Sequence, residues 1–195
     1  MEIVQGSITN YEADALVCPA NGDLEMVAIP GGIQYAFLVD GGKEIFEEAR
    51  EIANKYKIDY KNLATLENGI ESEVPGYSAN LTGAGKLPAK HVIHSVAVIF
   101  DEEINSIRCD KKVIGLSVRN ALDLGRDKGL KSIGFPALGT GLYNVPIEEC
   151  SEVTLDEFEV HLNQNTSIER LGLVLYSQDS YEWGKQIADE KFLKT

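Results

Sequence analysis

The stretch that most constrains the fold of this chain is Lys131–Pro146, which reads KSIGFPALGTGLYNVP. It opens on the apolar run Ile133–Phe135, typical of a strand buried on both faces, and then reaches two glycines around a small hydroxyl residue, Gly139–Gly141. From Glu148 onward the spacing is helical. A strand, a glycine loop and a helix start place backbone N–H groups around a phosphate in α/β proteins, and glycine supplies positive φ and room for the ligand. Because the chain has no lysine after these glycines and no GxGxxG pattern, an ordinary glycine turn stays open as the alternative.

Strand and helix patterns alternate through most of the chain. The apolar, β-branched run His91–Ile99 favours a strand, whereas Lys43–Lys57 repeats apolar residues at three- and four-residue spacing and favours an amphipathic helix. Asp59–Gly69 fits neither pattern. This alternation predicts an α/β fold with a largely parallel or mixed sheet and helices on both faces. No repeat, linker or low-complexity segment is present, so residues 1–195 are expected to form one domain. The remaining expected elements are strands at Glu2–Gln5, Ala13–Cys18, Ser132–Phe135 and Leu171–Tyr176, an extended segment at Ser72–Thr82, and helices at Cys109–Lys128, Glu148–Leu162 and Ser180–Leu193.

Charge and cysteine content argue against several kinds of function. The net charge of −13 disfavours binding to nucleic acid or to an anionic membrane, since such surfaces need clustered Lys and Arg. The three cysteines are an odd number without paired spacing, so no disulfide framework, metal site or cofactor is expected. No apolar run approaches the roughly 20 residues that span a bilayer. The start MEIVQGSITN lacks the features of a signal peptide, which predicts a cytoplasmic protein.

Several turns at predicted strand ends, read together, resemble a known family. Gly6–Thr9, Ala15–Asn21 and Pro30–Ile33 are similar to the opening of a macro domain, which typically reads Gly-Asp-Ile-Thr, then Asn-Ala-Ala-Asn, then a run of glycines. Leu87–Val96 looks like the central strand of that family, and Ser132–Tyr143 looks like its phosphate loop. The resemblance covers nearly the whole chain in the right order.

The resemblance implies a three-layer α/β/α sandwich with a mixed, largely parallel central sheet and a cleft at the strand ends for ADP-ribose or a relative. By this resemblance Asn21 would contact the ribose distal to adenine and is the tentative catalytic residue. Gly31–Ile33 and Gly139–Tyr143 would enclose the diphosphate from two sides, and Tyr176 would lie beside the adenine. The ligand contacts implied in this way are Ser7, Ile8, Ala20, Asn21, Gly31, Gly32, Ile33, Gly139, Thr140, Gly141, Leu142, Tyr143 and Tyr176.

The chain departs from the family pattern at four positions. Ser7 stands where the family usually has an aspartate that accepts a hydrogen bond from the adenine amine, so weak selectivity for adenine is expected. Cys18 replaces an asparagine, and Pro30 replaces a glycine and removes one N–H from the loop. Gln34 stands where one hydrolytic branch has an aspartate, and an amide cannot serve as a base.

Several of these residues also have a purely structural interpretation. Asn21 could cap the turn after its strand, since asparagine suits such turns. His94 is flanked by apolar residues and is expected to be a hydrogen-bonded strand histidine. Cys18 is expected to be an inert buried cysteine, because no neighbouring Lys, Arg or His would stabilise its thiolate. Tyr143 and Tyr176 could both be core aromatics.

The preferred function is therefore binding of ADP-ribose or a related nucleotide diphosphate sugar, free or carried on an ADP-ribosylated protein. One alternative is an enzyme that hydrolyses ADP-ribose 1″-phosphate or removes ADP-ribose from a protein, which would need an activated water. Another is a scaffold whose site has lost its ligand. Because the overall charge repels a diphosphate and the glycine loops contain no Lys or Arg, binding would have to depend on backbone N–H groups.

Overall fold

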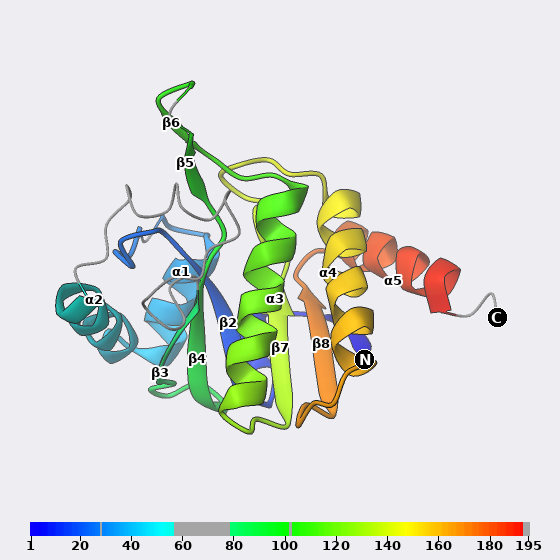
Figure 1. The fold of residues 1–195 in the computed structure, drawn as a ribbon, viewed down its shortest axis with the longest axis horizontal. Helices are drawn as coiled ribbons and strands as arrows, with labels where there is room; N and C mark the ends of the chain where they lie inside the picture. Colours follow the sequence, from blue (N-terminus) through cyan, green and yellow to red (C-terminus); the bar gives the residue numbers. More distant parts are fainter. Residues whose placement is uncertain (28, 57–78, 102, 193–195) are drawn as a thin grey trace.

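The computed structural model describes residues 1–27, 29–56, 79–101 and 103–192 and has three layers (Figure 1). The middle layer is a six-stranded sheet in the order β1-β8-β7-β2-β4-β3. Helices cover both of its faces, which confirms the expected α/β/α sandwich. The strands of the sheet are β1 (Glu2–Gln5), β2 (Ala13–Ala20), β3 (Ala79–Gly83), β4 (Ala89–Val96), β7 (Ser132–Pro136) and β8 (Arg170–Leu175). The helices are the 3-10 turn η1 (Ile8–Asn10), α1 (Ile33–Ala36), the π-helical η2 (Phe37–Gly41), α2 (Glu44–Tyr56), α3 (Lys111–Asp127), α4 (Ile147–Leu162) and α5 (Gln178–Phe192).

The sheet is parallel except at one edge. β1 pairs with β8, β8 with β7, β7 with β2 and β2 with β4, all in parallel, while β3 runs antiparallel to β4. The carboxyl ends of β1, β8, β7, β2 and β4 therefore meet at a single edge of the sheet. This edge collects the loops on which the sequence places its candidate ligand contacts.

Alternate residues of β2 belong to different cores. Ala15 and Val17 face the core that the sheet shares with α3, α4 and α5, and Leu16 and Cys18 face the core shared with η2 and α2. All four side chains are buried. This two-sided burial explains why the strand is a continuous apolar run without polar alternation.

A second feature of the fold is the ring of Tyr11, which the sequence pattern did not predict. The ring lies against two glycines of neighbouring strands, Gly134 in β7 and Gly172 in β8, where a Cβ would overlap it. The Tyr11 hydroxyl donates to Glu2 Oε1 at 2.5 Å, and the Arg170 guanidinium lies over the ring, 5.2 Å from its centre. Glycine in these strands thus marks the close approach of an aromatic ring.

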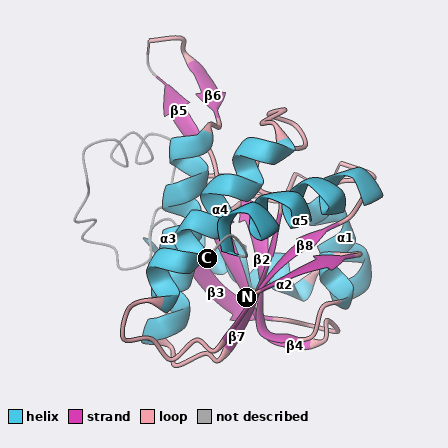
Figure 2. Cartoon of the chain, turned by 90° about the vertical axis from the view of Figure 1, so that its right-hand side faces the viewer, coloured by secondary structure: helices cyan, strands magenta, loops and turns pink. Residues whose placement is uncertain are grey.

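The strands and helices predicted from the sequence are confirmed, with shifted ends, where the structure describes them. The hairpin that follows β4 and the short helical segments η1, α1 and η2 were not among the predicted elements. The sequence predicted a strand over His91–Ile99, but β4 ends at Val96. Its parallel neighbour β2 ends at Ala20, whose carbonyl accepts from the Ala97 N–H at 3.4 Å, so β2 offers no further partner beyond this point. Ile99 instead begins β5 (Ile99–Asp101), which pairs with β6 (Ser106–Arg108) in a hairpin that projects from the body (Figure 2).

Two sequence segments fall partly or wholly outside the described residues. Asp59–Gly69 lies outside them, and of the extended segment Ser72–Thr82 only the part in β3 is described. Within the described ranges, no helix combines the length and the apolar character needed to cross a membrane.

Candidate functional site

The chain leaves the adjacent strands β2 and β7 toward opposite faces of the sheet. After β2 it continues into α1, η2 and α2, which pack on one face, and after β7 it continues into α4, which packs on the other. In open α/β sheets, ligands bind outside the carboxyl ends of the strands at such a reversal of direction. The candidate site is therefore the edge between β2 and β7, bounded by the segments 20–33 and 136–146.

The first segment begins with a turn that Asn21 closes. The Asn21 side chain donates from Nδ2 to the Glu25 carbonyl at 3.2 Å, and the Asn21 carbonyl accepts from the Leu24 N–H at 3.0 Å. Ala20, just before it, is buried. The structural interpretation of Asn21 is thus confirmed, and its role toward a ligand stays a prediction.

Gly31 and Gly32 of the first segment serve different geometries. Gly31 has a φ of 84°, the left-handed conformation that favours glycine. Gly32 caps the start of α1, its N–H donates to the Ile29 carbonyl at 2.8 Å, and a Cβ on it would lie 3.1 Å from that oxygen. The N–H groups of Gly31, Ile33 and Gln34 donate to no backbone carbonyl of a described residue. They are the groups that a helix start leaves available to a ligand.

Gln34 holds the first segment against the end of β2. Its Nε2 donates to the Pro19 carbonyl at 2.8 Å, and its Oε1 accepts from the Val27 N–H at 2.6 Å. Both polar atoms of the amide are therefore used inside the protein. Gln34 positions the loop, in agreement with the expectation that it is not a base.

The second segment is fixed at Gly139, which has a φ of 75°. Its carbonyl accepts from the Val145 N–H at 3.1 Å, and a Cβ on it would lie 2.6 Å from Cys109 Sγ. Gly141 differs, since a Cβ there would meet no atom within 4 Å and its φ is not positive. The sequence led us to expect positive φ at the glycines of this loop, which is confirmed for Gly139 and wrong for Gly141, because the tight reversal of the loop occurs two residues earlier.

The rest of the second segment presents backbone donors and one exposed apolar side chain. Within the described part of the chain, the N–H groups of Gly141, Leu142 and Tyr143 donate to no backbone carbonyl. Thr140 Oγ1 donates to the Ala137 carbonyl at 3.0 Å, so this hydroxyl stabilises the loop. Leu142 is 70% exposed, whereas Tyr143 packs against the cluster that contains Ala20. Tyr143 is thus partly a core residue that joins the two segments.

The candidate subsite for a base lies along the same edge, beyond β7, at the ends of the next two strands, β8 and β1. The Gly6 N–H donates to the Leu175 carbonyl at 3.0 Å, which holds the ends of β1 and β8 together. Ser7 follows one strand and Tyr176 follows the other. Tyr176 is 82% exposed and is not a core aromatic, while Ile8 is buried. An exposed aromatic ring at this edge is suited to stack on a flat base.

No cationic side chain belongs to either glycine segment. The segments 20–33 and 136–146 contain no Lys or Arg, and the first turn of α4 carries Glu148 and Glu149. Lys111, at the start of α3, pairs with Glu152. The charge of a bound diphosphate would therefore be met by backbone N–H groups.

Neither His94 nor Cys18, which lie near the carboxyl ends of β4 and β2, is suited to catalysis. His94 is buried, its Nε2 lies 3.0 Å from Thr82 Oγ1, and burial lowers its pKa to about 4. Burial also raises the pKa of the Cys18 thiol, which keeps it protonated. Both were predicted to be structural, and the geometry agrees. Among the described residues, no three His, Cys, Asp or Glu side chains gather as a metal site would require.

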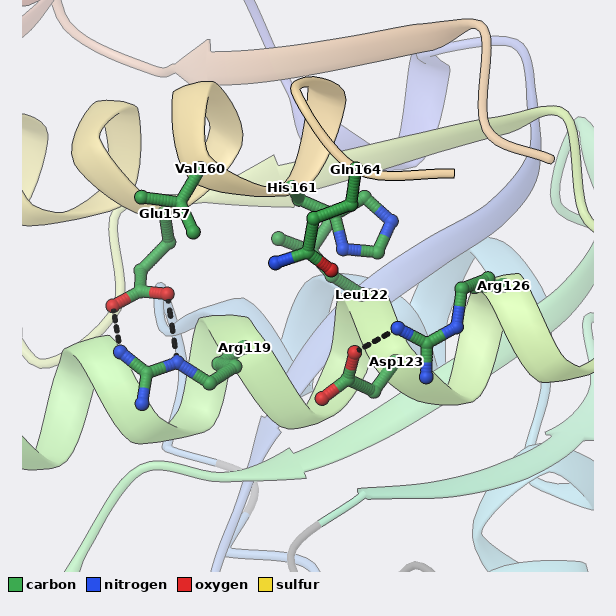
Figure 3. A pocket seen from close by; sticks show the side chains of 8 residues that line it. All are labelled: Arg119, Leu122, Asp123, Arg126, Glu157, Val160, His161 and Gln164. Carbon is green, nitrogen blue, oxygen red and sulfur yellow. Dashed lines mark hydrogen bonds and ion pairs between the residues drawn. The ribbon is translucent and has the colours of Figure 1, made fainter. Parts of the chain in front are cut away.

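A separate pocket of about 240 Å³ lies between the carboxyl-terminal halves of α3 and α4 (Figure 3). Arg119 pairs through two hydrogen bonds with Glu157, and Arg126 pairs with Asp123. His161 Nε2 lies 2.8 Å from Thr166 Oγ1. The charges of these groups are thus balanced within the pocket, and it lies far along the helices from the two glycine segments.

The chain is similar in sequence and in fold to known proteins. The Macro domain family model matches residues 17–154. An uncharacterized protein of Sulfurisphaera tokodaii is 32% identical, with 98% of this chain and 94% of the relative covered. O-acetyl-ADP-ribose deacetylase 2 of Pantoea vagans is 28% identical, with 92% and 93% covered. The solved Oceanobacillus iheyensis macrodomain with ADP has a TM-score of 0.75 at 27% identity, with 99% of this chain and 92% of that one covered.

Proposed function

The chain belongs to the macro domain family, and from this premise we propose that it binds ADP-ribose at the edge between β2 and β7. The observation that carries the proposal is the pair of glycine segments at neighbouring parallel strand ends, both with backbone N–H groups that no described backbone carbonyl accepts. The resemblance to a macrodomain solved with ADP supports the same ligand class.

In this proposal the diphosphate lies between the segments, in reach of the N–H groups of Gly31, Ile33 and Gln34 on one side and of Gly141–Tyr143 on the other. Backbone donors are short and fixed, so they provide local attraction even though the net charge of −13 repels the ligand at long range. Asn21 lies beside the distal ribose, and Tyr176 stacks on the base. The proposed contacts are Ser7, Ile8, Ala20, Asn21, Gly31, Gly32, Ile33, Gly139, Thr140, Gly141, Leu142, Tyr143 and Tyr176.

A calorimetric titration with ADP-ribose, paired with thermal unfolding, tests the proposal. At 100 times the dissociation constant the bound ligand stabilises the fold by about 2.7 kcal/mol. For a chain of this size the melting temperature should then rise by about 5–10 °C. ADP-ribose without its diphosphate, supplied as adenosine plus ribose, is the matched control and should give no shift. Absence of both heat and shift at millimolar ADP-ribose would overturn the proposal and favour a scaffold without a ligand.

A second candidate is turnover of an ADP-ribose derivative, which the resemblance to O-acetyl-ADP-ribose deacetylase 2 favours. Neither His94, Cys18 nor Gln34 offers a base, so such a reaction would use a water activated by the substrate itself and oriented by Asn21. Candidate substrates are O-acetyl-ADP-ribose, ADP-ribose 1″-phosphate and ADP-ribosylated protein. Chromatography that monitors the release of ADP-ribose from these substrates by wild type and by Asn21→Ala distinguishes turnover from binding alone.

We also propose the setting in which the chain acts. It functions in the cytoplasm as one domain over residues 1–195, and it binds ADP-ribose either free or on a modified protein. Fluorescence microscopy of the tagged chain and retention on an ADP-ribosylated protein column test the two parts separately.

A further inference from the structure

A chain of hydrogen bonds joins Ser7 to a carboxylate on another element. Ser7 Oγ lies 2.8 Å from Thr9 Oγ1, and Thr9 Oγ1 donates to Asp40 Oδ2 at 2.6 Å. Ser7 precedes η1 and Thr9 lies within it, just after β1, whereas Asp40 belongs to η2, 31 residues further along the chain from Thr9. Thr9 is only 2% exposed, while Asp40 is exposed. No pattern in the sequence indicated that these three side chains meet.

The direction of this chain follows from counting hydrogens. A threonine hydroxyl has one hydrogen, and that of Thr9 is committed to the Asp40 carboxylate. In the contact between Ser7 and Thr9, Ser7 must therefore be the donor and Thr9 the acceptor. Ser7 Oγ then has no hydrogen left to donate to a ligand, and its lone pairs are polarised by a chain that ends in a negative charge. Ser7 is thus held as an acceptor although its hydroxyl could in principle donate.

Ser7 lies where a base would be recognised if the proposed function holds. Ser7 follows β1 and Tyr176 follows β8, the neighbouring strand, and the hydrogen bond from the Gly6 N–H to the Leu175 carbonyl holds these two strand ends together. β8 lies one strand from β7, and β1 lies two strands from it. Two strand spacings amount to about 10 Å, which leaves room for a ribose between the glycine segments and this point. An acceptor beside a stacking ring accepts from the exocyclic amine of adenine and repels the carbonyl oxygen of hypoxanthine.

We propose that Asp40, acting through Thr9, fixes Ser7 as a hydrogen-bond acceptor and so makes the site selective for adenine over hypoxanthine. Asp40 is a positioning residue here and does not itself touch the ligand. The proposal rests on the proposed function, and it replaces the weak adenine selectivity that the loss of a carboxylate at Ser7 predicted. The missing charge is supplied from a distant part of the chain.

The test compares affinities for ADP-ribose and for its inosine analogue, IDP-ribose, by calorimetry. Wild type should prefer ADP-ribose by about tenfold or more, equivalent to about 1.4 kcal/mol. Asp40→Ala frees the Thr9 hydrogen, and Thr9→Val removes the link, so both should reduce the preference to about threefold or less while the protein stays folded. Asp189→Ala, an exposed aspartate on α5, is the control for the change in net charge and should keep the wild-type preference.

The ratio of the two affinities is the informative readout, because a merely structural effect would weaken both ligands alike. Ser7→Asp in the Asp40→Ala background should restore the preference for ADP-ribose, since it returns a fixed acceptor to the site. If wild type binds both ligands equally, or if Asp40→Ala and Thr9→Val retain the full preference, the proposal is overturned while ADP-ribose binding stands. If wild type binds neither ligand, the proposed function fails and this inference fails with it.

Discussion

The second glycine segment contains two glycines that should respond to substitution in opposite ways. At Gly141 a new side chain would meet no protein atom within 4 Å, and the φ is one that other residues adopt. Gly141→Val should therefore change stability by less than about 0.5 kcal/mol. The same side chain would occupy the space through which the diphosphate approaches the N–H groups. We expect a folded protein that has lost ADP-ribose binding.

Gly139→Ala should instead destabilise the fold. The φ of 75° costs a residue with a Cβ about 1–2 kcal/mol. The added Cβ would also lie 2.6 Å from Cys109 Sγ and 3.2 Å from Ile114 Cδ1, an overpacking that typically costs about 1–3 kcal/mol. Together these give about 2–5 kcal/mol, or a fall in melting temperature of about 4–20 °C for a chain of this size.

Gly129→Ala separates the two contributions to this cost. Gly129 has a φ of 69°, close to that of Gly139, but a Cβ there would meet nothing within 4 Å. Its substitution should cost only the backbone part, about 1–2 kcal/mol. Thermal unfolding and titration with ADP-ribose measure all three variants. Undiminished binding by a folded Gly141→Val protein would place the ligand elsewhere, and wild-type stability of Gly139→Ala would refute the packing argument.

Three further predictions follow from charge, burial and close packing. Raising the salt concentration from about 0.1 to 1 M should change the affinity for ADP-ribose by no more than a few-fold. Salt screens the repulsion by the net charge of −13 more than it weakens short backbone hydrogen bonds. A steep loss of affinity in calorimetry would reveal a cationic side chain at the phosphates. The pKa of His94 is lowered by burial to about 4, below its unfolded value of 6.5, so stability present above pH 6.5 is lost as the pH falls toward 4. Wild type should lose about 2 kcal/mol more than His94→Gln between pH 7 and pH 5 in urea unfolding, and equal losses would contradict this. Gly172→Ala should cost about 1–3 kcal/mol because its Cβ overlaps Tyr11, and in the Tyr11→Ser background the added cost should nearly vanish; simple additivity of the two changes would show that the ring is not responsible.

Most of the fold could be predicted from the sequence because its elements carry local signals. The runs that became β2 and β4 are apolar on both sides, and α2 and α3 carry regular apolar spacing, so their type follows from short stretches of chain. Where β4 ends could not be predicted in this way. Ala97, Val98 and Ile99 continue the apolar run, yet the strand stops at Val96, where its parallel neighbour β2 reaches its own end at Ala20.

The candidate site likewise has parts that could be predicted from local sequence and parts that could not. The two glycine segments and their lack of cationic side chains could be predicted from the sequence, since glycine patterns after apolar strands are local. Which glycine carries the positive φ could not, because it depends on the three-dimensional path of the loop, which reverses at Gly139 beside Cys109 and leaves Gly141 open. The meeting of Asp40 with Thr9 and Ser7 could not be predicted either, since a hydrogen bond between η2 and η1 depends on how these segments pack against the sheet. A pattern in sequence records what each residue prefers locally, whereas contacts between distant residues exist only once the cores on both faces of the sheet have formed.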